Sequence, residues 1–115
     1  MARSRRLPKQ ARRLILDPGN EVYFSAASVW EIAIKSALRR RDFDADAAAL
    51  ARAAAQGGFA ELAVTAAHAA RVAALPPVHR DPFDRLLVAQ AQAEPMTLLT
   101  NDGALAGYGP LVALI

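Results

Sequence analysis

The sequence HRDPFDRLLVAQA, at residues 79–91, contains the clearest helix start in the chain. Asp81 followed by Pro82 is typical of an N-cap and a first helical residue, because the first helical position needs no backbone N–H and proline has none. The apolar residues that follow predict a helix ending near Ala93. Asp84 therefore belongs to the first turn of this helix.

Turn-forming residues and changes in apolar periodicity divide the rest of the chain into alternating strands and helices. The alternation predicts an α/β fold of three layers, with a mostly parallel central sheet and helices on both faces. We expect strands at residues 21–25, 59–64, 96–100 and 111–115. The expected helices span 9–16, 25–40, from Asp44 to Gly57, from Thr65 to the residue before Pro76, and 81–93.

Basic residues are concentrated at the start of the chain. The formal net charge is +3, but residues 1–13 carry six basic and no acidic side chains, whereas residues 14–115 carry eight basic and eleven acidic ones. We therefore expect a basic N-terminal arm at 1–13, which includes the start of the first helix, and a single mildly acidic domain at 14–115. Such an arm suits nucleic acid or an acidic partner, and equally a solvated terminus.

The composition excludes several classes of site. The chain has no cysteine and two histidines, which excludes disulfides and thiolate metal sites and argues against an all-histidine zinc site. No apolar stretch reaches the roughly 18 residues of a membrane span, and Asp17 and Pro18 interrupt the short apolar run after the basic start, so there is no signal-peptide core. We expect a cytoplasmic protein with no membrane partner.

Three acidic residues fall where predicted strands end and predicted helices begin. Glu31 lies in the first turns of the helix after strand 21–25, Asp84 in the first turn described above, and Asp102 two residues beyond Thr100. In open α/β sheets, ligands gather at the carboxyl ends of the strands. Because clustered carboxylates repel unless a cation neutralises them, convergence of these acids predicts bound Mg²⁺ or Mn²⁺. Such a site can activate water and hydrolyse a phosphodiester.

Each acid also has a structural explanation, and the spacing leaves both open. Ser28 and Glu31 have the spacing of a capping box, in which the Glu31 carboxylate accepts a hydrogen bond from the Ser28 amide. Asp81 and Asp84 fit the same arrangement, and Asp102 lies in a sequence typical of a turn.

Residues 25–35 are SAASVWEIAIK, residues 79–91 are the HRDPFDRLLVAQA segment, and residues 98–102 are LLTND. In this order, the three segments resemble the successive signatures of PIN-domain proteins of the VapC toxin type. Together with the stretch from Leu7 to Val22, the resemblance covers essentially the whole chain. It implies a PIN-like fold and a Mg²⁺- or Mn²⁺-dependent endoribonuclease. It also implies a homodimer and a cognate antitoxin that holds the enzyme inactive.

The resemblance assigns roles residue by residue. Glu31, Asp84 and Asp102 match three members of the family's acidic quartet, which binds metal and carries out catalysis. Thr100 matches the hydroxyl residue that supports the last acid. We assign Asp81 to a supporting or N-cap role.

Arg80 and Arg85 flank the acidic edge, and we expect them to hold the RNA backbone. Salt bridges to Asp81 or Asp84 are the structural alternative. His79 has two comparable possibilities, a phosphate contact or a hydrogen bond within its loop.

Three further side chains are interpreted as structural. Trp30 is expected to anchor the packing of its helix, with base stacking as the less favoured alternative, and Lys35 to pair with Glu31 one turn away. His68 is expected to be at the surface or partly buried, without a catalytic task.

The chain departs from the family at its front. Family members open with an apolar strand that lies in the middle of the sheet and ends in the first acid of the quartet, whereas residues 1–6 are basic here. We therefore expect the fold to lack the family's first strand and one metal ligand. The neighbouring strands would then expose unpaired amides and carbonyls, unless they close up or borrow a strand from another chain.

Two functions follow from these observations. The first is a metal-dependent endoribonuclease of a type II toxin–antitoxin system, with RNA as substrate. The alternative is a catalytically inactive PIN remnant that binds an antitoxin or dimerises.

Overall fold

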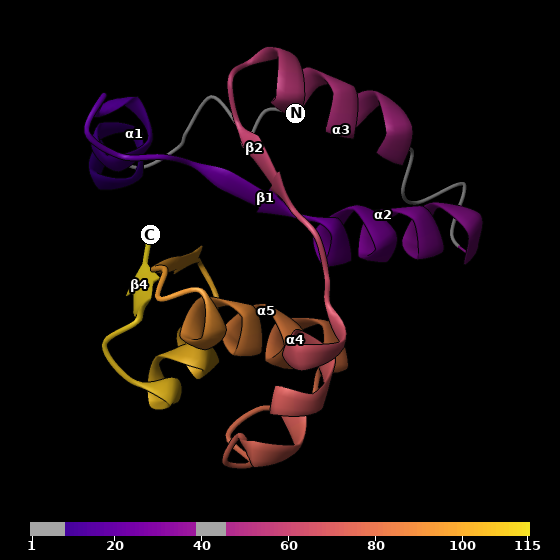
Figure 1. The fold of residues 1–115 in the computed structure, drawn as a ribbon, viewed down its shortest axis with the longest axis vertical. Helices are drawn as coiled ribbons and strands as arrows, with labels where there is room; N and C mark the ends of the chain where they lie inside the picture. Colours follow the sequence, from indigo (N-terminus) through magenta and orange to yellow (C-terminus); the bar gives the residue numbers. More distant parts are fainter. Residues whose placement is uncertain (1–8, 39–45) are drawn as a thin grey trace.

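The computed structural model describes residues 9–38 and 46–115, in which helices and strands alternate (Figure 1). The strands are β1 (Tyr23–Ser25), β2 (Ala60–Leu62), β3 (Leu98–Thr100) and β4 (Val112–Leu114). The helices are α1 (Lys9–Leu16), α2 (Ala26–Leu38), α3 (Ala47–Gln56), α4 (Ala66–Arg71) and α5 (Pro82–Ala93), with the short 3₁₀-helices η2 (Val72–Ala74) and η3 (Gly103–Tyr108). The predicted α/β class is confirmed.

The strands form two parallel pairs. β1 pairs with β2, and β3 pairs with β4. The first pair lies with α2 and α3 in the upper part of Figure 1, and β4 lies with η3 at the lower left. The predicted parallel arrangement is therefore present, but within the described ranges the central sheet is divided in two.

A groove of about 540 Å³ is lined by β1 and β3. The Leu98 amide donates to the carbonyl of Leu111, the residue before β4. Alternate residues of a parallel strand face opposite neighbours, so the N–H and C=O of Leu99 point away from β4. The Val22 carbonyl accepts from β2, so the backbone groups of Tyr23 point away from β2. Tyr23 and Leu99 both line the groove. In the described part of the chain, the β1–β2 pair and the β3–β4 pair do not join into one sheet.

The hydrophobic core lies along α5, where this helix packs against the loop after η2 and against η3. Its buried members are Leu75, Val88, Ala89, Leu105 and Tyr108. They come from the loop after η2, from α5 and from η3. The middle of α5 is consequently packed into this core, and the first turn of the same helix carries Asp84.

A buried polar network joins the β1–β2 pair to this core. Ser25 donates to the side chain of Gln90 on α5, and the Gln90 amide nitrogen lies 3.4 Å from Nδ1 of His68. The other ring nitrogen of His68 lies 2.7 Å from a carboxylate oxygen of Glu94. The prediction of a surface or partly buried His68 is wrong, because the residue is only 1 % exposed and its ring contacts polar groups at both nitrogens.

Capping residues account for several helix ends. Asp46 caps α3 by accepting from an amide of its first turn. The predicted cap at Asp44 and the basic end of the helix predicted at 25–40 lie outside the described residues. Gly58, with φ +95°, turns the chain from α3 toward β2 in a conformation that glycine adopts readily. The sequence patterns do not predict η3.

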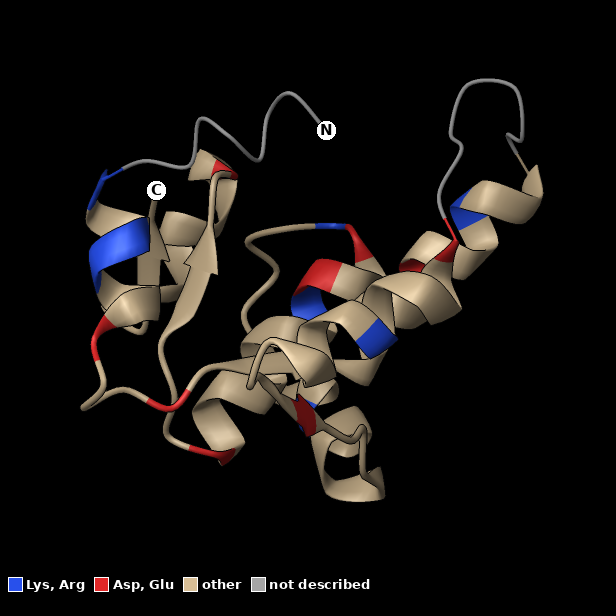
Figure 2. Cartoon of the chain, turned by 90° about the horizontal axis from the view of Figure 1, so that it is seen from above, with Lys and Arg blue, Asp and Glu red and all other residues tan. Residues whose placement is uncertain are grey.

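Helix α1 begins within the predicted arm and continues past residue 13 into the predicted domain. The boundary between arm and domain stays a prediction. The helix carries the basic residues Lys9, Arg12 and Arg13, and Figure 2 colours basic positions of the chain blue. In the described ranges, no helix has both the length and the apolar character needed to cross a membrane.

Candidate metal centre

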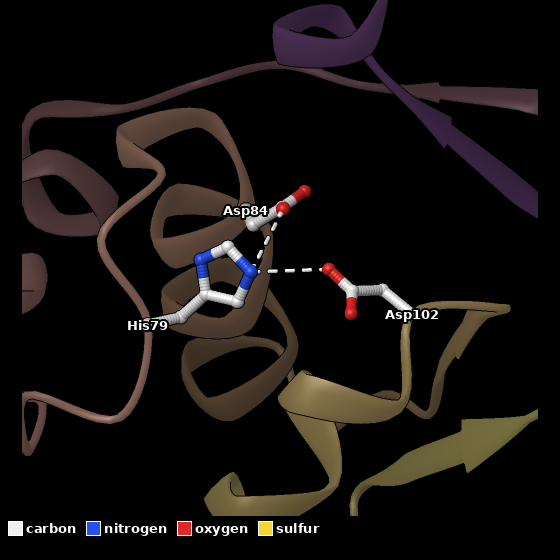
Figure 3. Close-up of side chains that lie close together, drawn as sticks. All are labelled: His79, Asp84 and Asp102. Carbon is white, nitrogen blue, oxygen red and sulfur yellow. Dashed lines mark hydrogen bonds and ion pairs between the residues drawn. The ribbon is translucent and has the colours of Figure 1, made fainter.

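Three side chains with metal-ligating atoms meet beside the start of α5 (Figure 3). His79 comes from the loop before α5, Asp84 from its first turn, and Asp102 from the turn after β3. Nε2 of His79 lies 3.0 Å from Oδ2 of Asp102 and 3.7 Å from Oδ2 of Asp84. One ligand atom from each residue lies within 4.8 Å of the other two, so tertiary structure brings distant segments to one point.

Asp84 is placed by the N-cap of α5. Oδ1 of Asp81 accepts from the amides of Phe83 and Asp84, and Pro82 occupies the first helical position. This cap fixes the first turn of the helix, from which Asp84 projects toward His79 (Figure 3). Asp81 therefore has the N-cap contact that the Asp-Pro sequence predicts.

Asp102 is held on both sides of its turn. Its amide donates to Oγ1 of Thr100 at 3.1 Å, and its Oδ1 accepts from the Ala104 amide at 3.0 Å, which caps η3. Its Oδ2 faces His79. The turn explanation and the site explanation for Asp102 are therefore compatible, because each uses a different carboxylate oxygen.

His79 joins the group although the sequence patterns do not place it among the acids. Its amide donates to the hydroxyl of the buried Tyr108 at 3.2 Å, and its Nδ1 accepts from the Asp81 amide at 3.0 Å. The sequence signal that could have indicated His79 is its position two residues before the N-cap of α5.

The cluster brings two carboxylates close to each other and to one histidine. Burial raises the pKa of Asp84, the carboxylates of Asp81, Glu31 and Asp102 raise it further, and His79 lowers it. A backbone amide of η3, followed by the hydrogen bond from His79, holds the pKa of Asp102 below its usual value. A cation at this point would relieve the repulsion that raises the pKa of Asp84.

The donor set fits a small divalent cation. Mg²⁺ binds oxygen at about 2.1 Å, so two oxygens on opposite sides of one ion lie about 4.2 Å apart. Small side-chain rotations bring ligand atoms that lie within 4.8 Å of one another to that separation. The side chains of Asp84 and Asp102 are 24 % and 41 % exposed, which leaves room for the water molecules that Mg²⁺ retains.

Glu31 lies on α2, near this group but outside it. Its carboxylate pairs with Lys35 at 3.1 Å, which confirms the predicted ion pair between successive helical turns. The capping box with Ser28 is wrong, because α2 begins earlier, at Ala26, and the hydroxyl of Ser25 accepts an amide hydrogen of its first turn. The charge of Glu31 reaches the cluster, and its role as a metal ligand stays a prediction.

The two arginines differ in their surroundings. Arg85 donates to the carbonyls of Val72, Pro76 and His79 and to the Tyr108 hydroxyl, and so holds the loop before α5 in place. Its predicted RNA contact stays a prediction. Arg80 is exposed in the same loop.

Trp30 is not the buried packing anchor that its helix predicts. The residue is 57 % exposed, and its ring contacts the ring of Phe83 edge-on with centroids 4.9 Å apart. Trp30 directly precedes Glu31, and Phe83 directly precedes Asp84. The exposed ring of Trp30 therefore links α2, which carries Glu31, to α5, which carries Asp84.

Comparison with protein families matches the PIN domain over residues 1–109. Comparisons with curated proteins and with solved structures give no match. The matched range includes nearly the whole chain, and with it the loop before α5, the first turn of α5 and the turn after β3. The chain therefore belongs to the PIN domain family.

Proposed function

We propose that this chain is a metal-dependent endoribonuclease, the toxin of a VapC-type toxin–antitoxin pair that acts in the cytoplasm. Glu31, Asp84 and Asp102 hold Mg²⁺ or Mn²⁺, a cognate antitoxin keeps the enzyme inactive, and the toxin forms a homodimer. Membership of the PIN domain family supports the nuclease class, because proteins of this family are generally nucleases and typically use divalent metals.

The observation that carries the proposal is the meeting of Asp84 and Asp102. Each acid lies at the start of a different helix, and local capping alone gives no reason for both carboxylates to point to one place. A divalent cation does need several oxygens at one place. The raised pKa of Asp84 supports the same conclusion, because burial and then the negative charge of neighbouring carboxylates disfavour its ionised form, and a bound cation would offset both.

The chemistry divides between the ion and the chain. A bound divalent cation supplies a nucleophilic water at neutral pH and stabilises charge on the phosphodiester. Asp84 and Asp102 bind the ion through carboxylate oxygens, and Thr100 fixes the backbone of the second acid. Arg80, an exposed residue that directly follows His79 in the sequence, holds a phosphate of the substrate in this proposal.

The test is cleavage of a mixed RNA pool with Mn²⁺ or Mg²⁺. We expect cleavage that EDTA abolishes and that Asp84→Asn reduces to background. Glu61→Gln is the matched control, since Glu61 is an exposed acid on β2 that takes no part in the cluster. If a protein with cation bound cleaves no RNA, the ribonuclease proposal fails.

The groove between the strand pairs favours a second candidate, a non-catalytic binding module. The backbone groups of Tyr23 and Leu99 lie at the groove without strand partners in the described chain, and such edges accept an added strand from a partner or a second copy. Titration with Mn²⁺ and light scattering separate the candidates. Absence of Mn²⁺ binding, together with retained antitoxin binding or self-association, favours the module.

A further inference from the structure

The two ring nitrogens of His79 face opposite kinds of partner. Nδ1 lies 3.0 Å from the amide nitrogen of Asp81. A backbone amide can only donate, so Nδ1 must accept and cannot carry a hydrogen. Figure 3 shows the other nitrogen, Nε2, aimed at the carboxylates of Asp84 and Asp102.

The hydrogen of the neutral ring is therefore on Nε2, as assigned from these partners. Nε2 then donates to Oδ2 of Asp102 at 3.0 Å, and Asp84 lies 3.7 Å away. A metal-bound imidazole nitrogen must instead offer a free lone pair, which requires the hydrogen to move to Nδ1. There it would oppose the Asp81 amide.

Moving the ring to avoid that conflict is also unfavourable. The amide of His79 donates to Tyr108, which is buried in the core, and its carbonyl accepts from Arg85. The residue that donates to Nδ1 also caps α5. If the ring rotated to point a hydrogen on Nδ1 in another direction, the hydrogen bond from the Asp81 amide to Nδ1 would be lost.

We infer that His79 is a positioning residue and not a metal ligand, an inference that rests on the proposed metal site. His79 donates to Asp102 from one side, while the Ala104 amide donates to the other carboxylate oxygen. Two donors together orient the carboxylate toward Asp84. The protein ligands are then all oxygens, which favours Mg²⁺ and Mn²⁺ over the imidazole-preferring Zn²⁺ and Ni²⁺.

Two variants test the inference through Mn²⁺ titration calorimetry. His79→Gln keeps an N–H donor near the position of Nε2 and offers no ring nitrogen, so we expect its Mn²⁺ affinity to remain within a few-fold of the unmodified chain. His79→Phe keeps a ring without a donor, and we expect a loss of about 10- to 100-fold, the range seen for groups that orient metal ligands. Circular dichroism checks that both variants fold.

Spectroscopy gives readouts that do not depend on activity. Nitrogen NMR of the metal-free chain is expected to show His79 with hydrogen on Nε2 and none on Nδ1. Electron spin echo measurements on the Mn²⁺-loaded chain are expected to show no directly bound nitrogen. A directly bound nitrogen, a hydrogen on Nδ1, or an equal loss of affinity in both variants overturns the inference. Failure of the unmodified chain to bind Mn²⁺ refutes the proposed metal site instead, and the NMR result still decides the tautomer.

Discussion

The two regions of the molecule differ in how well they are packed. Residues 66–115 supply every member of the hydrophobic core cluster, whereas residues 9–62 leave Trp30, Leu38 and Leu50 57 %, 77 % and 48 % exposed. Asp84 and Asp102 belong to the well-packed region and Glu31 to the other. The comparison teaches that acids predicted to share one role lie on elements that are packed to different extents.

The largest expected effect tests the packing difference itself. Leu105 is 1 % exposed in the core, so Leu105→Ala should lower the free energy of unfolding by about 3 kcal/mol through lost burial and a cavity. Leu50→Ala, on α3, should cost less than about 1 kcal/mol because the side chain is half exposed. Urea denaturation followed by circular dichroism measures both values. Equal losses would contradict the comparison.

Metal binding should stabilise the well-packed region next most strongly. At a free Mn²⁺ concentration one hundred times the Kd, the free energy of unfolding should rise by about 2.7 kcal/mol, and EDTA should reverse the rise. Asp84→Asn should abolish this stabilisation, because it removes a charged ligand. Glu61→Gln should retain it. Thermal unfolding with and without Mn²⁺ measures the difference, and a Mn²⁺ response that survives Asp84→Asn counts against the site.

The same variant has a second expected outcome in the absence of metal. The folded protein raises the pKa of Asp84, so its stability falls as pH rises from the carboxyl's ordinary pKa through the raised one, and at neutral pH the ionised group is destabilising. Metal-free Asp84→Asn should therefore be at least as stable as the unmodified chain. A clear loss of stability at neutral pH would show that the Asp84 carboxylate has a structural role that outweighs the destabilising effect of its ionisation.

The exposed aromatic side chain of the loosely packed region provides the third test. If Trp30 stacks on an RNA base, Trp30→Ala should weaken RNA binding by about 1–3 kcal/mol and leave the free energy of unfolding nearly unchanged. Leu38→Ala, another exposed apolar substitution on α2, is the control and should bind RNA normally. Fluorescence anisotropy measures the affinity. A change in self-association in place of RNA affinity would assign Trp30 to a contact between copies.

The smallest expected effect concerns the ion pair on α2. Lys35 and Glu31 form a pair one turn apart in which the lysine side chain is 55 % exposed, so Lys35→Ala should lower the free energy of unfolding by only about 0.3–0.5 kcal/mol. Mn²⁺ affinity should change by less than about threefold, since the pair is readily exchanged for water. A loss above 1 kcal/mol in urea denaturation would show that α2 is held more tightly than its exposure suggests.

Local signals explain why the helices were predictable. The cap at Asp81 and the proline after it determine where α5 begins, and the same kind of signal at Thr65 begins α4. Strand lengths were less predictable, since each strand is three residues long where the patterns predict about five. Pairing partners limit the length of a strand, and these partners lie far away in the sequence.

The candidate site was only partly predictable for the same reason. Asp84 and Asp102 carry recognisable positions at element ends, but the side of each helix that faces the other depends on packing. His79 and Arg85 gain their roles from contacts with Asp102 and Tyr108, each 23 positions away. No local pattern encodes such contacts.

The sequence alone determined the α/β alternation, the caps at Thr65 and Asp81 and the family, because these depend on neighbouring residues and on motifs in a fixed order. Only the tertiary structure decided that the strands divide into two pairs, that Trp30 is exposed and that His79 lies between two carboxylates. Those features arise when distant segments compete to bury apolar surface and to satisfy backbone groups, and that competition is settled by the whole fold.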